Sequence, residues 1–195
     1  MDEHSDKVWT YDDLVAMGGE PDGRKYEIFD GELVVSPSPT FGHQEIVKHL
    51  FLALVEQVEK RGLATVHFAP LDVILSKTRV VQPDLLVIGS QQREIIALHG
   101  LIGAPMLVVE VVSPSNAAHD RVRKRRFYAR GGMLEYWIVD PSSQEVQVLG
   151  LVPGGLSYRQ VGWFGPGDTI TSPSFDLAIP VNPVFGLPDE PTTDA

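Results

Sequence analysis

The sequence predicts one α/β domain in which a mixed central sheet is flanked by two main helices. Two short runs, "QPDLLVIG" (82–89) and "PMLVVEVVS" (105–113), are almost wholly apolar, as expected of strands that are covered on both faces. Residues 41–62 and 116–131 have the length and pattern of helices. The 195 residues, 43% of them hydrophobic, can bury one substantial core, and no repeat or linker divides the chain.

The first forty residues predict a short helix and a hairpin. Thr10 and Asp13 form a capping-box pattern at the start of a helix that ends at Gly18-Gly19. "KYEIF" (25–29) and "ELVVS" (32–36) flank Asp30-Gly31, which is a type I′ turn signal. The Ser-Pro-Ser-Pro run that follows cannot continue a sheet ladder and therefore predicts a loop.

The two long helices and the later strands follow from spacing and caps. The first helix has an apolar stripe at four-residue spacing and a C-terminal cap at Gly62. The second has a cap at Ser115 or Asn116 and ends at Gly131. Residues 89–104 contain glycines and predict a loop. The other expected strands are "ATVHF" (64–68), "LDVILS" (71–76), "LEYWIVDP" (134–141), "EVQVLGL" (145–151), "SYRQV" (157–161) and "FDLAIPV" (175–181).

The composition excludes several classes of protein. No apolar run approaches the roughly 20 residues that cross a bilayer, and "MDEHSDKVWT" at the N-terminus contains no signal-peptide core. The absence of cysteine excludes a disulfide framework and a thiolate zinc site, and the histidines do not have zinc-site spacing. We therefore expect a cytoplasmic protein without a membrane partner.

Glu110 is the residue that the apolar pattern does not explain. It lies in the middle of a strand that should be buried, where a lone ionised carboxylate is strongly unfavourable. The carboxyl group must therefore be protonated, paired with a cationic side chain such as a buried arginine, or bound to a metal cation.

Asp84 begins the other buried strand, so two neighbouring strands would bring two carboxylates to one point. Such an oxygen site suits a hard divalent cation, Mg²⁺ or Mn²⁺, and a bound cation would offset the desolvation of Glu110. The alternative for Asp84 is a turn or cap at the start of the strand, after Pro83.

The helix after Glu110 places Asp120, Lys124 and Tyr128 along one face, at i, i+4 and i+8. A lysine beside a metal-bound water can orient the nucleophile or balance charge in the transition state. Each residue also has a structural alternative. Lys124 could be a solvated residue of a basic helix, Asp120 could serve the helix N-terminus, and Tyr128 could be a core aromatic.

Five segments in this order resemble the PD-(D/E)XK nuclease superfamily, and in particular the Uma-two family of restriction-endonuclease-like proteins. The resemblance covers about residues 10–180, and it implies a restriction-endonuclease-like domain, which we place at residues 1–186. The composition of residues 187–195, which is polar, acidic and rich in proline, predicts a disordered tail. The segments are "YEIFDGELVVSPSPTFGHQEIV", "QPDLLVI", "LVVEVVSPSN", "DRVRKRRFY" and "LEYWIVDP".

The family pattern falls on Glu27, Asp84, Glu110 and Lys124 as candidate catalytic residues. The superfamily signature expects a lysine two residues after Glu110, where this chain has Val112. In the Uma-two group that lysine has moved to the following helix, so Lys124 fills the role. The resemblance also implies a homodimer or a higher homo-oligomer.

Together these observations predict an endonuclease that hydrolyses DNA with Mg²⁺ or Mn²⁺. Asp84 and Glu110 would hold the metal ion, Glu27 would be a further carboxylate near it, and Glu32 is the alternative to Glu27. Lys124 would position the attacking water. His43, which opens a helix beside the Ser-Pro loop, is expected to cap or pack, with a phosphate contact as the alternative.

The charge distribution limits where nucleic acid could bind. The net charge is −10, yet six of the 16 Lys and Arg residues lie in "RVRKRRFYAR" (121–130). This segment is either a solvated helix face or the part that approaches the DNA backbone. In the second case the residues are Arg121, Arg123, Arg125 and Arg126.

Two other functions remain open at this stage. The displaced lysine and the acidic surface allow a non-catalytic DNA-binding or assembly protein that keeps the nuclease fold. The same carboxylates also allow a phosphohydrolase that acts on small phosphoesters.

Overall fold

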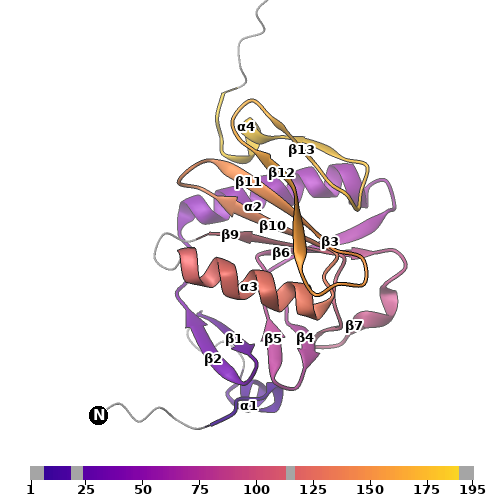
Figure 1. Cartoon of the computed structure of the whole chain (residues 1–195). Coiled ribbons are helices and arrows are strands. Elements are labelled where there is room, and N and C mark those ends of the chain that lie inside the picture. Colours follow the sequence, from indigo (N-terminus) through magenta and orange to yellow (C-terminus); the bar gives the residue numbers. More distant parts are fainter. Residues whose placement is uncertain (1–6, 19–23, 113–116, 189–195) are drawn as a thin grey trace, which may run out of the picture.

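Two six-stranded sheets form the framework, where the sequence predicted a single central sheet. The computed structural model describes residues 7–18, 24–112 and 117–188, with the backbone alone at 117–120 (Figure 1). The central sheet has the strand order β12-β11-β10-β9-β6-β3, and the second sheet has the order β2-β1-β5-β4-β8-β7. The central sheet is mixed as expected, because β9 and β10 are parallel and its other pairs are antiparallel.

The elements follow one another in this order. The first half contains α1 (Tyr11–Ala16), β1 (Lys25–Phe29), β2 (Glu32–Ser36), α2 (Phe41–Leu54), the π-helical turn η1 (Val55–Glu59), β3 (Ala64–Phe68), β4 (Val73–Ser76), β5 (Arg79–Val81), β6 (Leu85–Gly89), the 3₁₀ turn η2 (Arg93–Ile95), β7 (Ile96–Ala97) and β8 (Gly100–Ile102). The second half contains β9 (Leu107–Val111), α3 (Ala117–Gly131), β10 (Glu135–Asp140), β11 (Glu145–Leu151), β12 (Tyr158–Phe164), β13 (Thr169–Thr171), β14 (Ala178–Pro180) and α4 (Val181–Val184).

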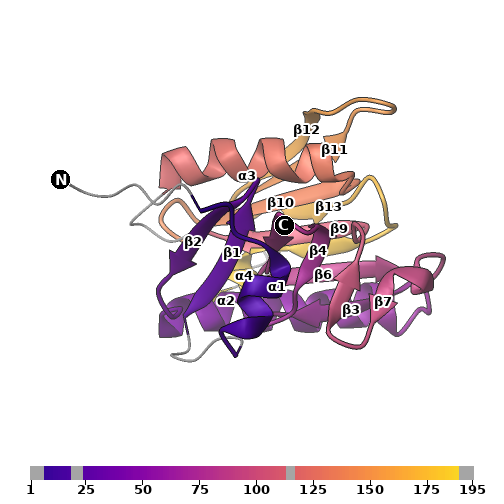
Figure 2. The ribbon, with the colours of Figure 1, turned by 90° about the horizontal axis from the view of Figure 1, so that it is seen from below.

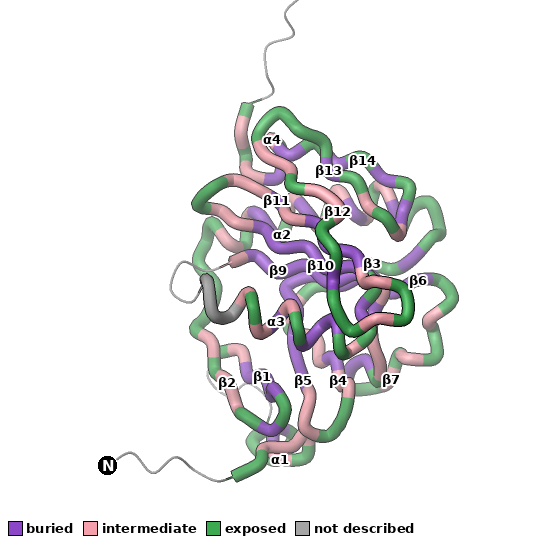
Figure 3. Tube along the Cα trace, in the orientation of Figure 1, coloured by how far each residue is buried: buried purple, intermediate pink, exposed green. Residues whose placement is uncertain are grey.

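The two faces of the central sheet are covered by different elements. Figure 2 shows α3 and α2 on opposite sides of the strands. Leu85 and Val109 belong to the core beneath α2, whereas Leu86 and Val108 pack with α3 and the second sheet. Because side chains alternate along a strand, Glu110 shares the face of Val108 and is directed towards α3. Strands β9 and β10 are buried along almost their whole length (Figure 3).

The N-terminal expectations that fall on described residues are confirmed. Thr10 caps α1 through a complete capping box with Asp13. The hairpin β1–β2 turns at Asp30 and Gly31, which both have positive φ, as a type I′ turn requires. The first turn of α2 is capped by Thr40, whose hydroxyl accepts from the His43 backbone N–H.

The region between β6 and β9 was predicted wrongly. Residues 89–104 were expected as a loop, but they contain η2, β7 and β8. Strand β8 is held by parallel pairing with β4, and β5 joins β4 to β1. Strands β5, β7 and β8 are only two or three residues long and leave almost no local pattern, and β5 and β8 also pair with strands that are distant in the sequence.

Some expectations fall outside the described residues. These are the helix cap at Ser115 or Asn116, the glycine at 19, and the tail from residue 189 onwards. Among the helices that the structure describes, none has the length and apolarity needed to cross a membrane.

Two glycine-to-alanine substitutions should change stability in opposite directions. A Cβ on Gly31, at φ +90°, would lie 2.7 Å from Val8 Cγ1, so Gly31→Ala should lower the free energy of unfolding by at least about 1–2 kcal/mol. Gly42 lies within α2 with no atom within 4 Å of an added Cβ, so Gly42→Ala should raise it by about 0.5–1 kcal/mol. Urea denaturation measures the free energy of unfolding of both variants. A change of the same sign and size in the two would contradict this account of the hairpin.

Candidate active site

The two carboxylates that the sequence singled out lie side by side. In the antiparallel β6–β9 pair, Leu85 faces Val109, and one further step of this register places Asp84 opposite Glu110. The Val111 N–H donates to Asp84 Oδ2 over 2.8 Å, which fixes the Asp84 side chain against β9. Both carboxylates are buried, at 8% and 6% exposure.

Glu27 reaches the same point from the second sheet. It lies on β1 with 1% exposure, and its Oε1 accepts a 3.0 Å hydrogen bond from the Gln82 backbone N–H. Gln82 immediately precedes the Pro83-Asp84 pair, so this bond joins the hairpin strand to the start of β6. Three carboxylates, from β1, from β9 and from the residue before β6, therefore gather where the two sheets meet.

Lys124 and Tyr128 approach the carboxylates from α3. Lys124 Nζ lies 3.0 Å from Glu110 Oε1 and 3.6 Å from Glu27 Oε2. The Tyr128 hydroxyl, fully buried, donates to the same Glu110 oxygen. Tyr128 is thus both a core aromatic and a partner of the site. The side chain of Asp120, the third residue of the predicted helix face, lies outside the described residues.

Lys25 is a site residue that the sequence analysis missed. Its ammonium lies 3.4 Å from Asp84 Oδ1, 3.7 Å from Glu110 Oε2 and 4.0 Å from Glu27 Oε1. A signal existed, because residues at i and i+2 of a strand share a face. Once Glu27 is assigned to the site, Lys25 follows on the same side of β1.

His43 also belongs to the site, where the sequence predicted mainly a capping or packing residue. Its Nε2 lies 3.1 Å from Asp84 Oδ2, and since a carboxylate only accepts, the ring donates from this nitrogen. Its Nδ1 is buried and has no hydrogen-bond partner within the part of the chain that the structure describes. Only its place in the first turn of α2, after the Ser-Pro loop, could have indicated this role.

Five of these residues, Lys25, His43, Asp84, Glu110 and Lys124, line a groove of about 1040 Å³ that opens to solvent. The Ser-Pro loop and the start of α2 form one wall, and the end of β9 with α3 forms another. A groove of this size can admit an extended substrate to the carboxylates. Its lining includes Lys25, Pro37, Pro39, His43, Phe68, Asp84, Glu110, Arg121, Lys124, Tyr136 and Phe185.

The pKa values of the two strand carboxylates move in opposite directions. Burial raises the pKa of Glu110, and the ammonium groups of Lys124 and Lys25 only partly offset this. Burial acts in the same direction on Asp84, but Lys25 and the hydrogen bond from His43 outweigh it, so the pKa of Asp84 falls well below its usual range. Burial also raises the pKa of the Tyr128 hydroxyl, which keeps this group a proton donor.

The donor set suits a hard divalent cation, because every acidic side chain at the centre supplies carboxylate oxygens. In the structure, however, the oxygens of these carboxylates are already in contact with lysine ammonium groups. No three His, Asp or Glu side chains in the described ranges are grouped as ligands of one metal ion. The cation that Asp84, Glu110 and Glu27 share in the structure is the Lys25 ammonium. In the described structure, the cationic side chains that pair with Glu110 are thus lysines and not the arginine considered from sequence.

The arginines of α3 are held by the protein in different ways. Arg123 pairs with Glu32 at 3.0 Å and lies over the Phe29 ring, and Arg125 donates to the Tyr158 carbonyl. Glu32, the alternative to Glu27, is therefore bound to Arg123 and exposed, away from the carboxylate cluster. Arg126 is exposed. Arg121 pairs with Asp140 and lines the groove.

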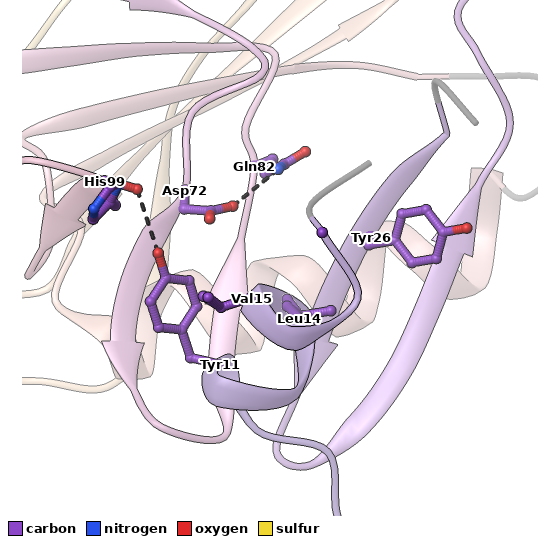
Figure 4. A pocket seen from close by; sticks show the side chains of 8 residues that line it. Tyr11, Leu14, Val15, Tyr26, Asp72, Gln82 and His99 are labelled. Atoms are coloured by element: carbon purple, nitrogen blue, oxygen red, sulfur yellow. Dashed lines mark hydrogen bonds between the residues drawn. The ribbon is translucent and has the colours of Figure 1, made fainter. Parts of the chain in front are cut away.

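A second cavity, of about 400 Å³, lies beside α1 and shares Gln82 with the groove (Figure 4). The Gln82 amide donates to Asp72 over 2.9 Å, and the Tyr11 hydroxyl donates to the His99 carbonyl over 3.4 Å. The cavity is connected to the site through Gln82, whose side chain contacts Asp72 and whose backbone N–H donates to Glu27.

The opposite pKa directions predict opposite pH dependences for the two amide variants. Glu110 binds its proton more tightly in the folded state, so its contribution to stability is present below about pH 4 and is lost as pH rises. Glu110→Gln should therefore become more stable relative to wild type from pH 4 to 8. Asp84 contributes above about pH 4, so Asp84→Asn should cost about 3–5 kcal/mol at pH 7, and less as the pH falls.

Urea denaturation of the metal-free proteins at pH 4, 6 and 8 measures both trends. Parallel curves for the two variants would show that the carboxylates do not differ in this way.

Comparison with known proteins places the fold in a family. A crystal structure at 1.96 Å resolution of a "putative nuclease belonging to DUF820" from Anabaena variabilis superposes with a TM-score of 0.68. The sequences are 19% identical, and the match covers 83% of this chain and 89% of the other. No curated protein matches the sequence. Residues 10–182 match the Uma2 family, described as "Putative restriction endonuclease". The chain thus belongs to the Uma2 family.

Proposed function

We propose that this protein is a metal-dependent endonuclease that hydrolyses phosphodiester bonds of DNA. The observation that supports this most directly is the group of three buried carboxylates and two lysines at a groove. A restriction-endonuclease family and a structural neighbour named as a nuclease point to the same reaction class. Mg²⁺, or Mn²⁺ in its place, is the proposed cofactor.

Asp84 and Glu110 are the proposed metal ligands, with Glu27 as a further carboxylate. When bound, the cation lowers the pKa of a water molecule and neutralises charge on the scissile phosphate. His43 and the Val111 N–H hold Asp84, and Tyr128 holds Glu110. This network fixes both carboxylates before a substrate arrives, which preorganises the site.

Lys124 is the proposed catalytic lysine. It lies 3.0 Å from Glu110 Oε1 and is itself buried at 8% exposure, so its ammonium is fixed next to a proposed metal ligand. From this position it can donate to an attacking water or stabilise negative charge on the phosphate as the bond breaks. The missing lysine at position 112 is compensated in this way by a residue from α3.

Arg121 is the arginine best placed to contact DNA. Its ion pair with Asp140 is partly exposed, with side chains at 30% and 21%, so a phosphate can replace the aspartate. Arg126 could add a sequence-independent phosphate contact from the same helix. A homodimer, in which two such sites would act on the two strands of a duplex, is part of the proposal.

One observation favours a second candidate, a DNA-binding protein without catalytic activity. Lys25 and Lys124 already compensate two of the three carboxylate charges, so each carboxylate has a cationic partner without a metal ion. The experiment below separates the two functions.

Cleavage of supercoiled plasmid and single-stranded DNA should require Mg²⁺ or Mn²⁺ and stop in EDTA. Glu110→Gln and Lys124→Ala should each lower the rate by about 100-fold or more, because each removes a group that acts on the reacting phosphate. Lys60→Ala is the control, since Lys60 is 64% exposed and pairs only with Glu56 on the surface in the described structure. Circular dichroism checks that every variant is folded.

Equal cleavage by all variants would exclude this site. Metal binding by folded wild-type protein without cleavage of any nucleic acid would favour the non-catalytic candidate, and turnover of a simple phosphodiester without DNA affinity would favour a small-molecule phosphohydrolase.

DNA affinity should depend on Arg121 in a salt-sensitive way. Arg121→Ala should weaken binding and reduce the slope of log K against log salt by about 0.9, the value for one phosphate contact. Arg61→Ala removes the same charge from a pair with Asp176, outside the groove lining, and should leave the slope unchanged. Fluorescence anisotropy of a labelled duplex in EDTA measures this, and equal slopes for both variants would remove Arg121 from the interface.

A further inference from the structure

Lys25 lies where a cation shared by the three carboxylates would lie. Its ammonium is within 4.0 Å of one oxygen each of Asp84, Glu110 and Glu27. Lys124 contacts the other oxygens of the two glutamates. The two lysines thus divide the oxygens of Glu110 and Glu27 between them, and only Lys25 also reaches Asp84.

We propose that Lys25 and the divalent metal ion compete for the same carboxylate oxygens, so that metal binding displaces the Lys25 ammonium into the groove. The inference rests on the proposed metal site, and it concerns which cation contacts the carboxylate oxygens before a metal ion binds.

Formal charge supports displacement over simultaneous occupancy. Three ionised carboxylates are balanced by one lysine and one divalent cation, whereas a second ammonium at the same oxygens would add an uncompensated positive charge. Like charges at such short range repel strongly in a poorly hydrated site. One of the three cations must therefore leave.

The contacts indicate that Lys25 is the cation that leaves. Its shortest ion pair is 3.4 Å, whereas Lys124 lies 3.0 Å from Glu110. The Lys25 side chain is 18% exposed and that of Lys124 is 10% exposed. Lys25 is also the first residue of β1 and lines the groove, so its flexible side chain can turn towards solvent without disturbing the strand.

Displacement would link metal binding to substrate binding. An ammonium in the groove gains a new anionic partner when a phosphodiester enters, so the phosphodiester would favour the arrangement that the metal ion requires. Two ligands that favour the same arrangement of a protein strengthen each other's binding.

Calorimetric titration of the DNA-free protein with Mn²⁺ tests the competition. Lys25→Met keeps the length of the side chain and removes its charge, and it should bind Mn²⁺ about tenfold more tightly than wild type. Lys60→Met makes the same change in net charge on the surface and should match wild type. Lys25→Gln also removes the charge but keeps a neutral hydrogen-bond donor. It should show the same increase in affinity, and it replaces Lys25→Met in the test if that variant does not fold without metal.

Thermal denaturation gives a second readout. Without metal, the Lys25 variants should melt below wild type, because their carboxylates lose a counter-charge, and Mn²⁺ should raise their Tm more than that of wild type. Affinity that is unchanged or weaker in both variants would show that lysine and metal lie together, and would overturn the competition while leaving the nuclease proposal intact. Failure of wild type and both variants to bind Mn²⁺ or Mg²⁺ would overturn both.

Discussion

The burial of three carboxylates at the junction of two sheets is the constraint on which the rest of the structure depends. Each of Glu27, Asp84 and Glu110 is at most 8% exposed, a degree of burial that ionised carboxylates tolerate only with partners. The partners come from every neighbouring element. They are the ammonium of Lys25 from β1, that of Lys124 from α3, the imidazole of His43 from α2, and backbone N–H groups at the ends of β5 and β9. The site therefore joins both sheets and both long helices.

The sequence predicted those parts of the site that lie on elements with a strong local pattern. The apolar strands β6 and β9 made their single carboxylates conspicuous, and the spacing of α3 put Lys124 and Tyr128 on one face. Their meeting in space then required only that β6 and β9 be neighbours, which they are.

What the sequence could not predict depends on contacts between distant segments. The second sheet is built partly from strands of two or three residues, whose existence depends on pairing rather than on composition. His43 faces Asp84 because of how α2 packs on the central sheet, a tertiary relation that no spacing expresses. Lys25 could have been found from the alternation of β1, but only after Glu27 had been placed.

The chain positions of the charged residues have a consequence for the net charge of the interior. Lys25 and Glu27 lie on one hairpin, whereas Glu110 and Lys124 lie on one strand–helix unit, β9–α3. Each segment therefore contributes one carboxylate and one ammonium group, and its formal charge at the site is zero. Neutral replacement of both members of either pair would leave the net charge of the interior unchanged, whereas replacement of one member would leave a buried charge without its partner. Asp84 lies outside both segments, and its charge is compensated by Lys25 and His43, which come from other elements.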